Sequence, residues 1–229
     1  MADPLTVISN IVLSFLLPFL WFLYFYKKDS NPEPFKWLLL AFISGIIATF
    51  PSLYFQEILS KIGLDKTNSN LFYFLSALSE EFFKFFVIWL FIFQKSVFDE
   101  SIDAIVYMTA SALGFAFFEN LSLYIRVLDE PSKLIFIYPF IRFVGANFLH
   151  ILASALIGFG YGEAIATRRF LPFTISFIFA SLIHFWYNVI VLKTETLISV
   201  LPIFWSVFFL LLIEINHIKI VHGRKLLRK

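Results

Sequence analysis

Cysteine is missing from all 229 residues of the chain. Its absence excludes disulfide bonds, thiolate metal sites and cysteine nucleophiles. Charge is also scarce, since 15% of the residues are charged and the net charge at pH 7 is +2, which gives no indication of nucleic-acid binding. The sequence has no internal repeat, no low-complexity linker and no stretch typical of a soluble domain. We therefore expect a single integral membrane domain over residues 1–229.

Hydrophobic residues are abundant instead. They make up 60% of the chain, against about 45–50% in a typical soluble domain. Apolar runs of about 18 residues or more, long enough to cross a bilayer as a helix, recur along the sequence. The sequence therefore predicts an all-α fold, a polytopic bundle of transmembrane helices in the lipid bilayer. About seven spans are expected, at residues 5–26, 35–59, 71–93, 104–124, 134–162, 170–192 and 197–220.

The basic residues between the spans predict the orientation of the chain. Eleven lysines and arginines flank the spans on one side of the membrane and five flank them on the other. Cytoplasmic connections carry the excess of basic residues. We expect the N-terminus outside, the C-terminus in the cytoplasm, and a multi-pass location in the cell (inner) membrane.

The span at residues 71–93 contains charged side chains near its middle, namely Glu80, Glu81 and Lys84. An ionised side chain at that depth costs about 2.5–3.5 kcal/mol on membrane-insertion scales. The spacings of three and four residues allow Lys84 to neutralise one of the two carboxylates. The other carboxylate is not explained in this way, so we predict that the pair belongs to a functional site.

Three other spans carry polar residues at a matching depth. They are Glu119 in the span 104–124, His150 in 134–162, and His184 with Asn188 in 170–192. At about 1.5 Å per residue, the carboxylates and imidazoles fall within about 8–15 Å of the outer surface. Each also shares a helix face with small residues, which allow transmembrane helices to pack closely. The sequence thus predicts one cluster inside the bundle, built from four helices.

Such a cluster is suited to hydrolysis. A desolvated carboxylate can take a proton from water, and we assign this role to Glu81, with Glu80 as the alternative. An imidazole or an amide can stabilise the oxyanion of a tetrahedral intermediate. The predicted catalytic residues are Glu80, Glu81, Glu119, His150, His184 and Asn188, with Lys84 as an orienting charge. Arg142 is interpreted as an anchor at the membrane interface.

The cofactor stays open at this point. A divalent metal such as zinc, bound by Glu81, Glu119, His150 and His184, could activate the water. A metal-free mechanism with a glutamate base explains the same residues equally well. No short ligand motif such as His-Glu-x-x-His occurs to decide between them.

Four motifs follow one another in an order that resembles the PrsW family of intramembrane proteases, distant relatives of the type II CAAX prenyl endopeptidases. They are Glu80-Glu81-x-x-Lys84, the segment from Gly114 to Asn120, His150 with glycines behind it, and His184-x-x-x-Asn188. The chain carries Glu119 after Phe115 where the prenyl endopeptidases carry histidine. The resemblance implies a protease that clips a single-span membrane protein, an anti-sigma factor, on its extracytoplasmic side.

Other functions fit parts of the pattern. A proton- or ion-coupled transporter could use the same glutamates and histidines, but they gather at one depth and no inverted repeat is present. A seven-span receptor with a Schiff base on Lys84 would place that lysine between glutamates without matching context. A non-catalytic scaffold that keeps the protease shape is a further alternative.

Overall fold

The computed structural model describes residues 32–64, 69–127 and 142–194, with isolated positions between 8 and 27. Every regular element in the continuous ranges is a helix, which confirms the all-α prediction. The elements are α2 (Phe35–Lys61), α3 (Asn70–Ile88) with the π-helical turn η1 (Trp89–Phe93), α4 (Asp103–Val127), the π-helical turn η3 (Phe143–Asn147), α6 (Phe148–Thr167) and α7 (Leu171–Thr194).

Among the described residues, four segments are long and apolar enough to cross a membrane, and they correspond to the predicted second, fourth and sixth spans and to the described part of the fifth. Helix α3 with η1 matches the predicted third span, and its charged residues distinguish it from the other four. The predicted fifth span ends at Thr167 rather than at residue 162. The seventh span lies outside the described residues, as do both termini and most of the first span. The count of seven spans and the orientation of the chain therefore stay predictions.

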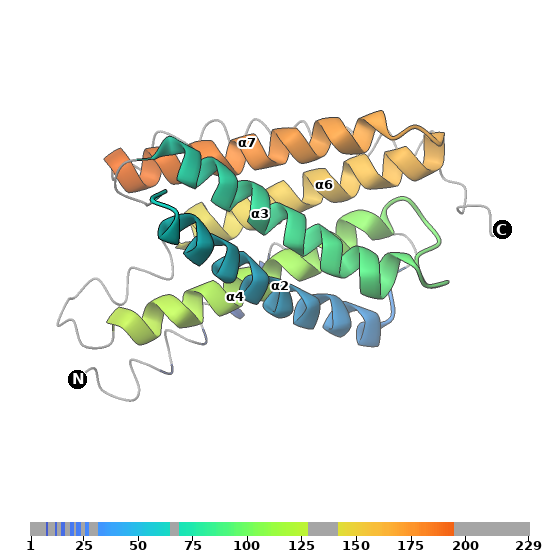
Figure 1. Cartoon of the computed structure of the whole chain (residues 1–229). Helices are drawn as coiled ribbons and strands as arrows, with labels where there is room; N and C mark the ends of the chain where they lie inside the picture. Colours follow the sequence, from blue (N-terminus) through green and yellow to red (C-terminus); the bar gives the residue numbers. More distant parts are fainter. Residues whose placement is uncertain are drawn as a thin grey trace.

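The five long helices form a ring in the order α2, α4, α6, α7 and α3, with α3 returning to α2. In Figure 1, α6 and α7 lie side by side and α3 crosses in front of them. Helix α6 is buried on almost all sides, and Leu149, Ile151, Ala153 and Ile157 are fully enclosed. A ring of this kind has a protein interior that is shielded from lipid, and polar groups can gather there.

Glycines bring α2 and α4 into direct backbone contact. A Cβ atom on Gly45 would collide with the backbone of Ser111, and one on Gly114 would collide with the backbone of Phe42. Each glycine therefore faces the other helix without a side chain, which permits the close approach typical of membrane helix pairs. This crossing lies in the first half of α2 and near the middle of α4, and beyond it Ser52 and Gln56 of α2 line a cavity with Glu119 of α4.

Helix α3 turns its polar face toward the interior of the ring. Glu80, Glu81 and Lys84 are at most 5% exposed, whereas Phe82 and Phe86 on the opposite face are 45% and 43% exposed. An exposed aromatic face is favourable against lipid, and the cost of buried charge is lowered only by partners inside the protein. The predicted inward orientation of the charged stripe is therefore confirmed.

Candidate active site

Glu81 is enclosed by two partners from α3 and α7. Lys84 Nζ donates to Glu81 Oε1 at 2.7 Å, and His184 Nδ1 lies 2.7 Å from the same oxygen. The side chains of Glu81 and Lys84 are fully buried. Because an ionised carboxylate only accepts hydrogen bonds, Nδ1 of His184 must carry a proton that it donates to Glu81. The ion pair anticipated for Lys84 is therefore present, and its carboxylate is Glu81.

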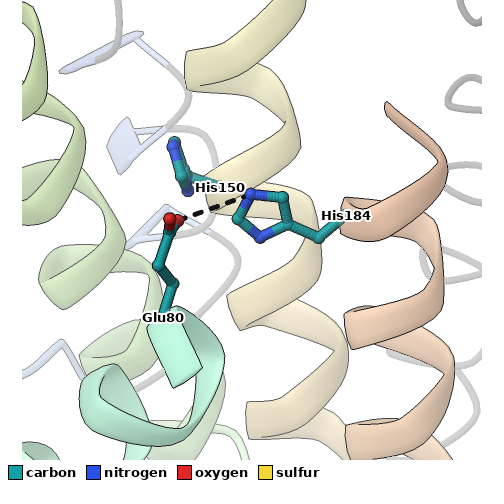
Figure 2. Close-up of side chains that lie close together, drawn as sticks. All are labelled: Glu80, His150 and His184. Carbon is teal, nitrogen blue, oxygen red and sulfur yellow. Dashed lines mark ion pairs between the residues drawn. The ribbon is translucent and has the colours of Figure 1, made fainter. Parts of the chain in front are cut away.

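Glu80 has a different environment although it is the adjacent residue. Its Oε1 accepts a hydrogen bond from Gln56 Nε2 at 2.9 Å, and its Oε2 lies 3.4 Å from His184 Nε2. Figure 2 shows Glu80, His150 and His184 pointing toward one another from α3, α6 and α7. Since Nδ1 of a neutral His184 carries the ring proton, Nε2 presents a lone pair to the carboxylate. Two facing lone pairs are favourable only with a proton or a cation between them.

The site has two halves: the first consists of Glu80, Glu81 and His184 on α3 and α7, and the second is built around Glu119 on α4. Its Oε2 lies 2.9 Å from His150 Nε2 and accepts a hydrogen bond from Arg142 Nη2 at 3.0 Å. Arg142 Nε also donates to the side-chain oxygen of Asn120, a fully buried residue whose Nδ2 donates to Asn147 at 3.2 Å. The interpretation of Arg142 as an interface anchor is wrong, because its guanidinium points into the site and binds two consecutive residues of α4.

His150 and Lys84 connect the two halves. Lys84 Nζ lies 3.4 Å from His150 Nδ1, and the His150 and His184 rings are 5.0 Å apart between centroids. Lysine only donates hydrogen bonds, so Nδ1 of His150 accepts here and Nε2 donates to Glu119. Five of the six predicted catalytic residues, with the predicted orienting residue Lys84, thus form one continuous polar network.

Two cavities, of about 220 Å³ and about 280 Å³, border this network. The first lies between α2 and α4, where Ser52 and Phe118 contribute to its wall. The second lies among α3, α6 and α7 and is lined by His150 and His184, and by Asn188, the sixth predicted residue. Gln56, Glu80, Glu119 and Arg142 line both cavities. The two carboxylates that reach open space are therefore Glu80 and Glu119, whereas Glu81 lines neither cavity.

The donor set fits a divalent metal ion. Glu80, His150 and His184 are buried and each offers a ligand atom within 4.8 Å of the others. Two imidazoles and one carboxylate are a known donor set of catalytic zinc sites. The predicted metal set differs from this group, because it contained Glu81 in place of Glu80 and also included Glu119. Binding through His150 would require that its contact with either Lys84 or Glu119 gives way.

Gln56, Asn120 and Arg142 are the polar residues at the site that the sequence reasoning did not assign to it. Gln56 is uncharged and lies beside Glu57 near the end of its predicted span, so it lacks the signal of buried charge that indicated Glu80 and Glu81. Asn120 is adjacent to Glu119, and neighbouring residues of a helix point in different directions. In the structure, Arg142 donates hydrogen bonds to both Glu119 and Asn120, so these adjacent residues of α4 belong to the same site.

Comparison with known proteins identifies related chains. Residues 33–213 match the family described as PrsW family intramembrane metalloprotease, and this range includes every predicted site residue. A curated relative named Protease PrsW from Geobacillus kaustophilus is 31% identical over 176 residues, 75% of each chain. Proteins of the same name from Oceanobacillus iheyensis and Bacillus subtilis are 34% and 30% identical over 170 and 171 residues, 73% of this chain and 75% of theirs. No solved structure matches the chain.

Proposed function

The chain belongs to the PrsW family of intramembrane metalloproteases, and on that premise we propose that it cleaves a single-span membrane protein of the anti-sigma-factor kind on the extracytoplasmic side of the membrane. The observation that carries the proposal is the junction of two cavities at Glu80 and Glu119, inside a ring of helices. A peptide segment that enters this junction meets carboxylates, imidazoles and a guanidinium away from lipid.

We assign the metal to Glu80, His150 and His184, the three buried residues whose ligand atoms lie together. A divalent cation bound there would polarise the scissile carbonyl and lower the pKa of a bound water. His184 is oriented for this role, because its Nδ1 donates to Glu81 while its Nε2 faces Glu80. A carboxylate behind a ligating histidine fixes both the tautomer and the direction of the ring.

Glu81 and Lys84 therefore act on His184 rather than on the substrate. The ammonium of Lys84 balances the charge of Glu81, which lets that carboxylate remain ionised in a fully buried position. This division of the adjacent glutamates replaces the assignment of Glu81 as the base. Glu81 lacks access to either cavity, so it has no route to a water molecule beside the substrate.

Glu119 is the better proton acceptor. Its side chain is 34% exposed, and its hydrogen bonds to His150 and Arg142 in the described residues both use Oε2. Oε1 is then the oxygen that can take a proton from water and pass it to the leaving amine. Asn188, on the wall of the larger cavity, is suited to donate a hydrogen bond to the oxyanion.

The choice of substrate follows from the setting of the site. A peptide bond within an intact helix has its backbone groups paired, so the segment must unwind before it can be attacked. The two cavities offer room for side chains on both sides of such an unwound bond. The expected depth of the site, about 8–15 Å from the outer surface at 1.5 Å per residue, favours cleavage near the outer end of a single span.

A cleavage assay with purified protein in detergent and a single-span substrate tests this function. We expect cleavage by the natural chain, no cleavage after chelation, recovery with added Zn²⁺, and loss of activity in Glu80→Gln and His184→Ala. Cleavage that survives both substitutions would overturn the site assignment. Single cysteines placed at Asn70 and Lys95 of this cysteine-free chain test the side, since Asn70 should be labelled from outside and Lys95 from the cytoplasm.

A further inference from the structure

Helix α2 contributes one long polar side chain to the site, that of Gln56. Gln56 Nε2 donates to Glu80 Oε1 at 2.9 Å across the α2–α3 interface. Two other polar residues of α2 that line the smaller cavity bond to their own helix instead, Thr49 to the carbonyl of Ile46 and Ser52 to that of Ala48. Gln56 thus differs from its neighbours in reaching a charged group on another helix.

The contact decides how Glu80 presents its two oxygens. Oε1 is held by Gln56, and this leaves Oε2 directed at His184 Nε2, 3.4 Å away. Glu81, by comparison, is held through one oxygen by both Lys84 and His184. Without Gln56, the described residues offer Glu80 no second anchor, and a flexible glutamate side chain on the wall of two cavities would populate several rotamers.

The amide of Gln56 also suits this position chemically. It is neutral, so it can hold an ionised carboxylate without supplying a positive charge that would compete with a cation. A lysine in its place, as Lys84 is for Glu81, would neutralise Glu80 and weaken its attraction for a metal ion. The adjacent glutamates therefore have partners of different charge. Glu81, which orients His184, is bound by the cation of Lys84, and Glu80, the proposed metal ligand, is bound by the neutral amide of Gln56.

We propose that Gln56 is a positioning residue that holds Glu80 with Oε2 toward His184, so that this carboxylate is ready to bind the metal. The proposal rests on the proposed function, because it takes Glu80 as a ligand. Groups that orient a metal ligand from behind change metal affinity by about 10–100-fold when they are removed. Gln56 acts through Glu80 and need not touch the substrate.

The test measures equilibrium affinity for Co²⁺ and Zn²⁺ in the full-length purified protein. Gln56→Met keeps the length of the side chain and removes the donor, and we expect affinity to fall about 10–100-fold. The matched control is Glu57→Met on the next residue, which is exposed and forms an ion pair with Lys61 at 2.6 Å. The control should bind metal as the natural chain does, and both variants should retain their thermal unfolding temperature. Turnover of substrate should show a lower kcat with little change in KM for Gln56→Met.

A double-mutant cycle separates positioning from a general structural effect. In a Glu80→Gln background, Gln56→Met should cause no further loss of metal affinity, since the group through which it acts is already altered. Natural affinity in the single variant Gln56→Met, or equal losses in both backgrounds, would overturn the proposal while leaving the protease function intact. Undiminished metal binding in Glu80→Gln and His184→Ala would instead refute the metal site itself.

Discussion

Among the described residues, carboxylates gather in two groups, one at the cavities and one near the start of α4. The second group consists of Glu33, Asp99 and Asp103, and it too has oxygens close enough together to surround a cation. Glu33 and Asp103 are 4% and 1% exposed, which is similar to Glu80 and Glu81. Residue type, burial and mutual distance therefore do not distinguish the two groups.

Their partners distinguish them. Asp103 Oδ2 accepts hydrogen bonds from the backbone N–H groups of Asp99 and Glu100 at 2.9 and 2.7 Å, and Glu33 accepts one from the hydroxyl of Tyr107. These bonds tie the turn before α4 to the helix. The carboxylates at the cavities are instead joined to imidazoles and cations from other helices. These partners indicate that the group near Asp103 stabilises the turn, and they support the proposal that the group near Glu80 performs chemistry.

Loss of the Glu80 carboxylate or of the His184 imidazole should have the largest effect on cleavage. Glu80→Gln and His184→Ala are each expected to reduce the cleavage rate by at least about 10²-fold, more than the loss of an outer partner would, because each removes a proposed metal ligand. The measurement is initial rate per folded enzyme, with the fold checked by circular dichroism. Asp103→Asn, measured alongside, should retain its rate; an equal loss there would remove the distinction between the two groups.

Breaking the buried ion pair should affect stability strongly. Lys84→Met leaves Glu81 charged, buried and without its ammonium, and we expect a loss of about 3–5 kcal/mol in the free energy of unfolding. Adding Glu81→Gln removes the unbalanced charge and should recover most of the stability without recovering activity. Thermal unfolding of both variants checks this. A double variant as unstable as Lys84→Met would show that the charge is not the cause.

Arg142→Leu tests whether the guanidinium holds Glu119. We expect cleavage to fall by about 10–100-fold, because Glu119 loses one of its two hydrogen-bond partners and Asn120 loses a donor. Arg142→Lys keeps the charge but cannot bind two neighbouring residues in the same way, so it should recover only part of the rate. Steady-state kinetics on the three proteins measures the effect. Full activity of Arg142→Leu would show that the contacts of the guanidinium with Glu119 and Asn120 are not needed for cleavage.

Asp103→Ala should have the smallest effect, and it should be confined to stability. Removal of the carboxylate leaves backbone N–H groups of the turn without their acceptor, at a cost of about 1–3 kcal/mol. The catalytic rate per folded molecule and the affinity for Zn²⁺ should not change. Metal binding that weakens in this variant would indicate a second cation site near the start of α4.

Much of the helical architecture could be predicted from the sequence. The apolar runs predicted α2, α3, α4 and α7 to within a few residues, because length and hydrophobicity are local properties. The inward face of α3 was predicted from the spacing of its charged residues. The start of the predicted span that contains α6 lies outside the described residues. Its end at Thr167 was missed because the apolar run stops at Glu163, whereas the helix continues beyond that charged residue.

The roles within the site could not be predicted in the same way. Gln56 was overlooked because one amide in an apolar span carries no charge and gives a weak signal. Arg142 was assigned to the interface because its position suggested it, and only the packing of η3 against α4 shows that the side chain reaches Glu119. Asn188 remains a predicted residue that lines the larger cavity.

The sequence by itself determined that this protein is a bundle of membrane helices in which the ionisable groups in the middle of the spans turn inward. The physical reason is the high cost of exposing a charged group to lipid. Only the tertiary structure decided which side chains contact each of the two adjacent glutamates. Glu80 and Glu81 are about 100° apart around the axis of α3, since a helix has 3.6 residues per turn. Both contact His184, through different ring nitrogens, but their other neighbours differ. Glu80 meets Gln56 of α2 at the edge of both cavities, and Glu81 meets the enclosed Lys84.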